Sequence, residues 1–242
     1  MRIPRIYQDI SLAAGDRVEL DKTAAHHLTR VLRMQDTQKI ILFNGGGGEY
    51  TSTLSLQGKD VFANIEHFDE RNTESHLNIT LLQGISKGER MDICIQKAVE
   101  LGVSKIVPVI CQRSVVNIKG ERSDKKHQHW HGIIINACEQ SGRTHIPQLS
   151  EAIKLKDIIS KQINGLKLTL SPDATTTLPD ISATEKNISL LIGPEGGLDD
   201  DEIKLAQQHG FLTVRMGPRI LRTETAAIAA IAALQVLRGD LA

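Results

Sequence analysis

The sequence is poor in aromatic residues, which make up 3% of its 242 positions. Single-stranded RNA binders commonly stack bases on exposed aromatic rings, and so few rings make such a surface hard to assemble. The chain also has no net charge, with 29 basic and 29 acidic residues. This balance argues against indiscriminate binding of polyanions, although it leaves room for a local basic patch.

Cysteine is scarce as well. Cys94, Cys111 and Cys138 are far apart and odd in number, which predicts neither a disulfide framework nor a zinc knuckle and favours a reducing compartment. No apolar run approaches the roughly 18 residues that span a bilayer. The amino terminus, with Arg2 and Arg5, lacks the apolar run of a signal peptide. We therefore expect a cytoplasmic protein.

The first part of the chain has the pattern of a small β-domain. Short segments typical of strands cover residues 17–20, 39–43, 49–56 and 61–68, with a helix predicted at 22–33. The glycine run at 44–48 invites comparison with a phosphate-binding loop. Because no Gly-Lys-Ser/Thr follows it and strands flank it, we interpret it as a hairpin connection. The segment therefore predicts a barrel-like domain.

A polar stretch, DERNTESH at residues 69–76, separates this segment from the rest and suggests domains at 1–72 and 73–242. Strands and helices then alternate, which predicts an α/β domain with a mainly parallel sheet. The predicted helices are 89–101, 122–140, 199–209 and 223–237, and the predicted strands are 77–84, 105–111, 166–171, 188–192 and 212–216.

Two of the predicted helices carry further signals. Gly102 is a natural left-handed stop for the helix at 89–101. The last helix is apolar nearly all round over residues 226–234, so it must be buried within the domain or against another subunit.

One predicted strand breaks at its carboxyl end into a glycine-rich loop. The sequence LLIGPEGGL at residues 190–198 is followed by the acidic start of a helix at 199–202. Ligands in open α/β sheets bind at the carboxyl ends of strands, and glycines permit close approach of the backbone. A glycine pair alone is more often only a tight connection, so this loop needs a second signal.

The second signal is the sequence MGPRILRTETA at residues 216–226. It also leaves a strand through Gly-Pro and enters a helix at Thr223, a good cap residue. Between strand and helix stand Arg219, Arg222 and Glu224, charges whose place in a loop suits binding. The structural alternative for Arg222 is an ion pair with Glu224 or Glu195.

These two segments, together with MRIPRIY at 1–7 and GERMDICIQKAVELGV at 88–103, closely resemble the RsmE family. Members of that family are methyltransferases that make 3-methyluridine in the 16S RNA of the small ribosomal subunit. Four separated motifs in the same order carry the resemblance from the first residues to the last helix. It implies an amino-terminal PUA-like β-barrel and a SPOUT domain with a trefoil-knotted parallel sheet, assembled as a homodimer.

The resemblance also implies S-adenosylmethionine as the methyl donor, held by three loops of the knot. By match, the cofactor-binding residues are Leu170, Ser171, Pro172, Ile192, Gly193, Pro194, Glu195, Gly196, Gly197, Met216, Gly217, Ile220, Leu221 and Arg222. The glycine-rich fingerprint of Rossmann-like methyltransferases is missing, because ISKGE at 85–89 follows the strand at 77–84. This absence favours the knotted class independently.

The implied chemistry asks for a cation near the target base. Uracil N3 becomes a good nucleophile once its proton leaves and negative charge spreads onto the ring oxygens. A guanidinium can stabilise that anion, and we prefer Arg222 to Arg5 for this role. Glu224 or Glu195 could accept the proton, or either could hold an arginine instead.

RNA contacts should surround the pocket, because the base must leave its stack. Residues 76–150 carry ten basic and six acidic side chains, the excess expected of an RNA-facing region. The candidates for phosphate contact are Arg2, Arg5, Arg30, Arg33, Lys87, Arg90, Arg113 and Arg143.

His127, His129 and His131 resemble metal ligands, but only the first and last share a helix face. We expect no metal, and we interpret these residues, like His26 and His27, as part of a solvated or RNA-facing surface. Two other functions stay open: a noncatalytic RNA-binding or assembly factor, and a metabolic enzyme that binds nucleotide phosphates at the Gly-Pro-Glu-Gly-Gly turn. The first predicts no S-adenosylmethionine binding, and the second predicts thermal stabilisation by nucleotides.

Overall fold

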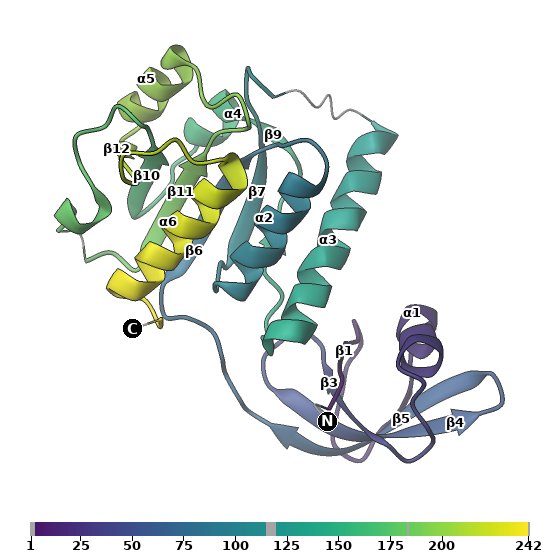
Figure 1. Ribbon diagram of the computed structural model, residues 1–242. Coiled ribbons are helices and arrows are strands. Elements are labelled where there is room, and N and C mark those ends of the chain that lie inside the picture. The colour runs from purple at the N-terminus through teal and green to yellow at the C-terminus, as the bar shows by residue number, and fades with distance from the viewer. Residues whose placement is uncertain (1–2, 115–119, 183, 242) are drawn as a thin grey trace. The chain divides into compact units, whose positions relative to one another are not determined.

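The computed structural model describes residues 3–114, 120–182 and 184–241 (Figure 1). The chain forms two compact units. The first comprises Met1–Glu74 with Ile135–Ile146, and the second comprises Ser75–Ile134 with Pro147–Ala242.

The first unit is built on a five-stranded sheet of order β1-β3-β4-β5-β2. β1 pairs parallel with β3, and the other pairs are antiparallel. The strands are β1 (Arg5–Tyr7), β2 (Arg17–Glu19), β3 (Lys39–Phe43), β4 (Glu49–Gln57) and β5 (Asp60–Asp69). Every strand predicted in this region is confirmed, and residues 44–48 connect β3 to β4 as the predicted hairpin. β1 was not predicted from the sequence.

The helix of this unit is shorter than predicted. Asp21 caps α1 (Lys22–His26) by accepting hydrogen bonds from the amides of Thr23 and Ala24, at 2.7 and 3.0 Å. The chain then forms a π-helical turn, His27–Val31, so the prediction of one continuous helix to residue 33 is wrong. Leu28 inside the turn is fully buried and Val31 at its end is exposed. Arg33 has the left-handed φ of +52°, in which a right-handed helix cannot continue.

The second unit contains a seven-stranded sheet in which every pair is parallel. Its order is β12-β10-β11-β6-β7-β8, and β9 also pairs with β7. The strands are β6 (Asn78–Gly84), β7 (Lys105–Ile110), β8 (Gln148–Leu149), β9 (Ile153–Lys154), β10 (Leu166–Leu170), β11 (Asn187–Ile192) and β12 (Leu212–Val214). The α/β class with a parallel sheet is confirmed, whereas β8 and β9 were not predicted.

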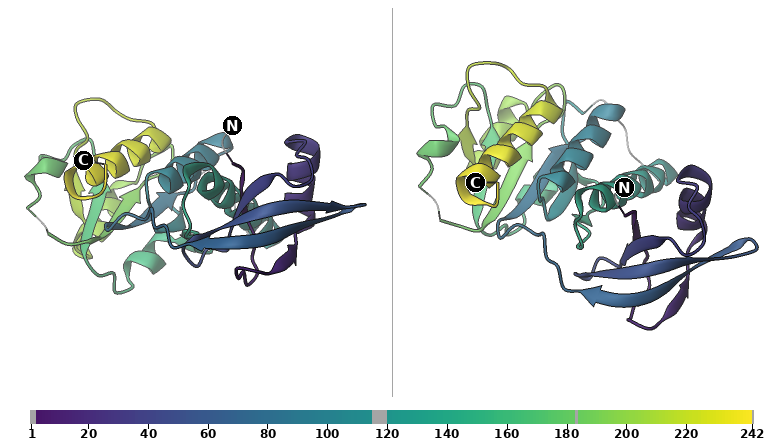
Figure 2. Two further views of the ribbon diagram at one scale, coloured as in Figure 1. Left: turned by 90° about the horizontal axis from the view of Figure 1, so that it is seen from below. Right: turned by 60° about the horizontal axis from the view of Figure 1, so that its bottom comes forward.

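Helices pack on this sheet in two groups. α2 (Glu89–Glu100) and α6 (Thr223–Arg238) lie side by side against it (Figures 1 and 2). α4 (Leu155–Ile159) and α5 (Asp200–Gln208) share a different core cluster with Leu82 and Leu191. Side chains alternate between the faces of a strand, so the two groups cover opposite faces of the sheet. A short 3₁₀ turn, Leu178–Asp180, follows β10.

The ends of the helices follow from their sequences. Gly102 ends α2 with φ +82°, the predicted left-handed stop. Asp199 caps α5 through a capping box with Glu202, which explains the acidic start seen in the sequence. Thr223 was expected to cap α6, but it is the first residue of the helix. Arg222 occupies the N-cap position, and its side chain makes no capping hydrogen bond.

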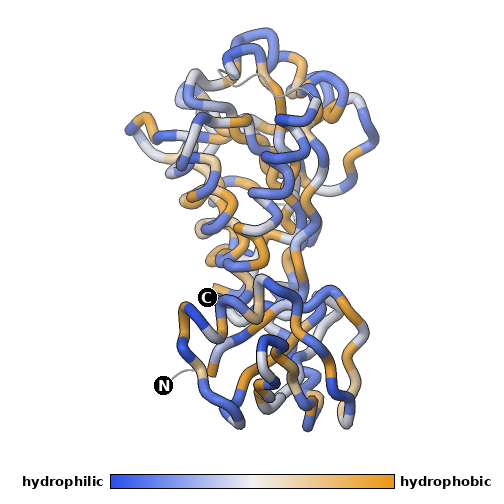
Figure 3. Tube along the Cα trace, turned by 90° about the vertical axis from the view of Figure 1, so that its right-hand side faces the viewer, coloured by the Kyte–Doolittle hydropathy of each residue, from blue (hydrophilic) through white to orange (hydrophobic). Residues whose placement is uncertain are grey.

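The remaining long helix, α3 (Glu121–Ser141), is divided between the units: its residues up to Ile134 belong to the second and those from Ile135 to the first. Hydropathy along the trace changes every few residues, as expected for elements with one buried face (Figure 3). In the described part of the chain, no helix is long and apolar enough to cross a membrane.

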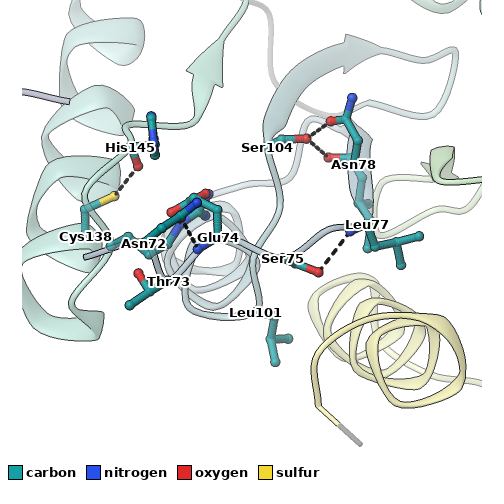
Figure 4. A network of polar contacts seen from close by, with 12 residues as sticks. Asn72, Thr73, Glu74, Ser75, Leu77, Asn78, Leu101, Ser104, Cys138 and His145 are labelled. Atoms are coloured by element: carbon teal, nitrogen blue, oxygen red, sulfur yellow. Dashed lines mark hydrogen bonds and ion pairs between the residues drawn. The ribbon is translucent and has the colours of Figure 1, made fainter. Parts of the chain in front are cut away.

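A buried amide fixes the far end of α6. Gln235 is fully buried; its Nε2 donates to the Leu101 carbonyl at 2.9 Å, and its Oε1 accepts from the Ser75 hydroxyl at 2.9 Å. Ser75 Oγ also accepts from the Leu77 amide at 3.1 Å (Figure 4). All polar atoms of the amide side chain are thus paired, which makes its burial tolerable.

Candidate functional site

Three loops at the carboxyl ends of adjacent strands line one cavity. β12, β10 and β11 are neighbours in a parallel sheet, so their carboxyl ends meet at one edge. The cavity has a volume of about 270 Å³. Its walls consist of Leu170, Ser171, Pro172, Ile192, Gly193, Pro194, Glu195, Gly196, Gly197, Leu198, Arg215, Met216, Gly217, Arg219, Ile220, Leu221, Thr223 and Ala226.

Glycine is required where the loop after β11 meets β6. A Cβ atom on Gly84 would lie 2.6 Å from Pro194 Cδ and 2.7 Å from the carbonyl carbon of Gly193. A Cβ on Gly193 would lie 2.7 Å from the Leu198 nitrogen. Because Cβ atoms do not approach other atoms so closely, side chains at these two positions would push the loop out of place.

Polar contacts hold the same loop from two further directions. Glu195 accepts a hydrogen bond from the Lys87 amide at 2.7 Å and one from Arg90 Nη1 at 3.2 Å. Arg113 Nη1 donates to the Gly196 carbonyl at 3.0 Å. The loop is therefore fixed at Glu195 and at Gly196 by segments that follow β6 and β7.

The Glu195 carboxyl is ionised more readily than an ordinary glutamate. Burial acts to raise its pKa, but hydrogen bonds from the Lys87 amide and its own backbone amide, with the Arg90 guanidinium, outweigh burial and hold the pKa below 4.5. Its second oxygen, Oε2, is buried and has no hydrogen-bond partner among the described residues. A ligand donor in the cavity would satisfy that oxygen.

Comparisons with known proteins agree across the chain. Residues 73–235 match the model of the RNA methyltransferase domain, and residues 20–66 match the RNA methyltransferase PUA domain. The Ribosomal RNA small subunit methyltransferase E of Buchnera aphidicola (subspecies Schizaphis graminum) is 39% identical, over 99% of this chain and 98% of the relative. The chain belongs to the ribosomal RNA small subunit methyltransferase E family.

Two solved structures resemble this member of the methyltransferase E family over the whole of both chains. A protein of Legionella pneumophila, solved in complex with the bound cofactor SAM, is 44% identical with a TM-score of 0.97. A Ribosomal RNA small subunit methyltransferase E of Neisseria gonorrhoeae, bound to S-adenosyl methionine, is 41% identical with a TM-score of 0.93. The expected PUA-like amino-terminal domain is confirmed by the family model.

The cavity of this methyltransferase E family member brings together the residues predicted to bind the cofactor, with the exception of Arg222. Four further lining residues were not predicted to bind the cofactor: Leu198, Arg215, Thr223 and Ala226. Arg219, whose place in the loop suggested binding, also lines the cavity. Arg215 directly precedes the predicted loop segment, and a search for charges at loop ends would have found it. Ala226 gave no signal, because it stands among other alanines of α6.

Arg222, predicted to stabilise the anion, and Glu224, a candidate proton acceptor, differ in their position beside the cavity. Arg222 is exposed at the N-cap of α6, next to the lining residues Leu221 and Thr223. Glu224 stands in the first turn of α6 but does not line the cavity. Its buried Oε2 has no hydrogen-bond partner among the described residues, and its charge adds to burial in raising the pKa of the Cys94 thiol to about 12.

Two of the arginines predicted to contact RNA are buried in the first unit. Arg5 is 7% exposed, forms an ion pair with Glu49 and donates to the Arg143 carbonyl at 3.2 Å. Arg143 is 4% exposed and pairs with Glu74, whose Oε1 accepts from Nε at 2.9 Å. These guanidinium groups therefore stabilise the fold of that unit, and phosphate would have to displace their carboxylates.

The remaining candidates of the RNA set lie at the surface. Arg30, Arg33, Lys87, Arg90 and Arg113 are exposed, and Arg2 lies outside the described residues. Arg33 has φ +52°, a left-handed conformation that is uncommon outside glycine.

Two of the three histidines of α3 have protein partners. His129 Nε2 lies 2.9 Å from an oxygen of Asp92, and His127 Nε2 lies 3.4 Å from the Leu149 carbonyl. Within residues 3–114, 120–182 and 184–241, no group of three His, Cys, Asp or Glu side chains is placed to hold a metal ion.

Cys94, Cys111 and Cys138 are free and buried, and burial is the main cause that raises the pKa of each thiol to about 12.

Proposed function

We propose that this protein transfers a methyl group from S-adenosylmethionine to N3 of a specific uridine in 16S ribosomal RNA, giving 3-methyluridine. The observation that carries the proposal is the single cavity formed by residues 170–172, 192–198 and 215–221 in a member of the methyltransferase E family. A noncatalytic assembly factor would not need a preformed cavity at this sheet edge. A nucleotide-binding enzyme would use the glycine turn for phosphate, but the carboxylate of Glu195 lines that turn and would repel it.

The residues of the cavity fit S-adenosylmethionine. Leu170, Ile192, Ile220 and Leu221 offer apolar surface for an adenine ring. The unpaired Oε2 of Glu195 suits the ammonium group or a ribose hydroxyl of the cofactor. Bound S-adenosylmethionine supplies a methyl group on a positively charged sulfur. The protein's own task is then to present the uridine and to stabilise its anion.

We propose Arg222 as the residue that stabilises the uracil anion. It is exposed at the start of α6, directly after the lining residue Leu221, so its guanidinium is free to turn toward a base above the cavity. Two hydrogen bonds to the uracil oxygens would favour loss of the N3 proton. Arg5 is less suitable, because its ion pair with Glu49 is buried.

Glu195 and Glu224 remain the alternative proton acceptors. Glu195 lines the cavity, but its lowered pKa makes it a weak base and its Oε1 is already occupied by Lys87 and Arg90. Glu224 Oε2 has no hydrogen-bond partner in the described part of the chain, but that oxygen is buried and the side chain does not line the cavity. We therefore expect most of the rate to come from alignment of the reactants and from Arg222.

For RNA binding we propose a division of labour between domains 1–72 and 73–242. Arg30 and Arg33 of the PUA-like domain and Lys87, Arg90 and Arg113 of the catalytic domain would contact phosphates. Such contacts give a salt-dependent affinity, while the choice of uridine depends on the site. The reaction would take place in the cytoplasm, on ribosomal RNA or the small subunit.

We propose further that the catalytic domain is knotted as in SPOUT enzymes and that two copies associate through α6. Support for the dimer comes from an apolar cavity lined by Leu178, Pro179, Ala232, Ala233, Val236 and Leu237, among others. Val236 and Leu237 are each about half exposed. Glutamate at both positions should convert a dimer to monomers in light scattering, whereas Lys204→Glu on the exposed face of α5 should not.

One experiment tests the reaction. Purified protein is incubated with labelled S-adenosylmethionine and with small subunits that lack the modification, and the label is mapped by nuclease digestion and mass spectrometry. We expect label on N3 of a single uridine. Label on another base, or none despite cofactor binding, would refute the proposed substrate.

A further inference from the structure

A chain of buried hydrogen bonds runs beneath the cavity and ends on its glycine loop. The Cys94 thiol donates to Gln83 Oε1 at 3.2 Å, and Gln83 Nε2 donates to the Thr223 hydroxyl at 2.9 Å. The Thr223 hydroxyl donates to the Gly193 carbonyl at 2.6 Å. All three side chains are at least nine-tenths buried, and they come from α2, β6 and α6.

The donor and the acceptor of each of these hydrogen bonds follow from the chemistry of the groups. The Gly193 carbonyl can only accept, so the single proton of the Thr223 hydroxyl points to it and the hydroxyl must accept from the Gln83 amide group. Gln83 Nε2 also donates to the Gly84 carbonyl at 3.0 Å, which leaves its oxygen for the Cys94 thiol. Burial raises the pKa of that thiol to about 12, so it carries the proton it must donate.

The last hydrogen bond of this series joins two of the three segments that line the cavity. Gly193 begins the loop after β11, whereas Thr223 follows directly on the loop after β12 and begins α6. Both residues line the cavity. The loop after β11 also packs tightly against β6. A Cβ atom on Gly84 would have no room beside Pro194 of that loop. The Thr223 hydroxyl therefore adds a hydrogen bond to this loop close to its tight backbone contact with β6.

We propose that Thr223 is a positioning residue for the methyl donor: its hydroxyl, held by Gln83 and Cys94, sets the distance between the 193–197 loop and the 216–222 loop and thereby preorganises the pocket. This inference rests on the proposed binding of S-adenosylmethionine. Losing the bond leaves the Gly193 carbonyl and a Gln83 N–H without partners in a buried place, which favours a rearranged loop. Binding must then restore the loop, and affinity falls.

The test is equilibrium binding of S-adenosylmethionine to Thr223→Val and Thr223→Ser, by calorimetry at a temperature where both are folded. Valine has the shape of threonine without its hydroxyl, and we expect about a tenfold higher Kd, the effect of one buried hydrogen bond. Serine keeps the hydroxyl and should stay within about twofold of the unaltered protein. In the protein without cofactor, hydrogen exchange of the Gly197 amide, which donates to the Pro194 carbonyl at 2.8 Å, should accelerate in Thr223→Val alone.

Thr169→Val is the matched control. Thr169 is fully buried, and its hydroxyl donates to the Leu191 carbonyl at 3.1 Å, but it does not line the cavity. Thr169→Val removes this hydroxyl and should lower the melting temperature as much as Thr223→Val does. The Kd for S-adenosylmethionine should stay unchanged. Equal Kd values for Thr223→Val and the unaltered protein would overturn the positioning role. Failure of the unaltered protein to bind S-adenosylmethionine would instead refute the proposed function.

Discussion

Arg222 is the residue on which the proposed chemistry depends most directly. It stands at the N-cap of α6 beside the cavity but outside its lining, so its removal should spare the cofactor. We expect Arg222→Ala to reduce kcat by about 10²–10³-fold, the usual effect of losing one donor that stabilises a developing anion. The Kd for S-adenosylmethionine should change less than about twofold. Single-turnover methyl transfer and calorimetry measure the two quantities.

Arg219→Ala is the informative comparison, because Arg219 lies on the same loop and does line the cavity. Arg219→Ala should raise the Kd for S-adenosylmethionine by a larger factor than it lowers kcat. The opposite pattern, with turnover lost only in Arg219→Ala, would move the stabilising role from Arg222 to Arg219.

Glu195 gives the site a predictable dependence on pH. Because its pKa is lowered in the folded protein, its contacts stabilise the loop at every pH above the ordinary carboxyl value of 4.5 and are lost as the pH falls through the lowered pKa. Hydrogen exchange of the 193–198 segment should therefore accelerate only under more acidic conditions than that value. Glu195→Gln should remove this acid-induced step, because an amide accepts from Lys87 and Arg90 without titrating.

The ion pair of Glu195 with Arg90 is partly exposed. Its contribution to the acid-induced change in hydrogen exchange should therefore become smaller in high salt. The contribution of the hydrogen bond from the Lys87 amide should not depend on salt in this way. An acid step that is equally large in Glu195→Gln would assign it to another carboxylate.

Among the elements, the contact between β6 and the glycine loop makes a steric prediction. Gly84→Ala places a methyl group against Pro194 and should weaken S-adenosylmethionine binding at least about tenfold, besides costing about 1–3 kcal/mol of stability through overpacking. Calorimetry and thermal unfolding provide the two measurements. Gly132→Ala, in the interior of α3 with open space around it, should instead stabilise the protein by about 0.5–1 kcal/mol. Normal binding in Gly84→Ala would show that the loop can move without loss.

Element boundaries were predictable wherever a long periodic segment met a clear stop. α2 ends at Gly102 and α5 starts at the Asp199 capping box, as their sequences indicate. β1, β8, β9 and α4 have two to five residues each, too few to establish a period. The π-helical turn at His27–Val31 was unpredictable for another reason. Ala24 and Leu28 are buried four residues apart, the spacing of a continued α-helix, so the apolar pattern does not reveal the turn.

Two of the three loops of the site were predictable because both carry Gly-Pro after a strand, and parallel strands bring their ends together. The third, at residues 170–172, was expected only from the family resemblance. The supporting contacts were not predictable. Gln83 and Cys94 stand inside ordinary strand and helix patterns, and their roles arise only when β6, α2 and α6 meet. Likewise, nothing in the sequence separates the buried Arg5 and Arg143 from the exposed Arg30 and Arg33, since their carboxylate partners are distant along the chain.

At the scale of the whole molecule, the first unit should not fold from its amino-terminal residues alone. Glu139 accepts from the Tyr7 amide at 2.9 Å, and Arg143 pairs with Glu74. Without residues 135–146, Glu74 and Arg5 lose buried partners, and breaking a buried pair costs about 3–5 kcal/mol. A fragment of residues 1–74 should therefore give a poorly dispersed NMR spectrum. The same fragment joined to 135–146 through a glycine-serine linker should fold, and a folded 1–74 fragment would contradict this dependence.

The return of residues 135–146 to the first unit also limits how the gene can be recombined. A hybrid that takes residues 1–74 from one parent and the rest from another would match the Glu74 and Tyr7 of one lineage with the Arg143 and Glu139 of a different one. Swaps with a single junction should therefore lose solubility as the parents diverge. Grafts that also exchange the 135–146 segment keep each carboxylate with its own partner and should survive at greater evolutionary distance.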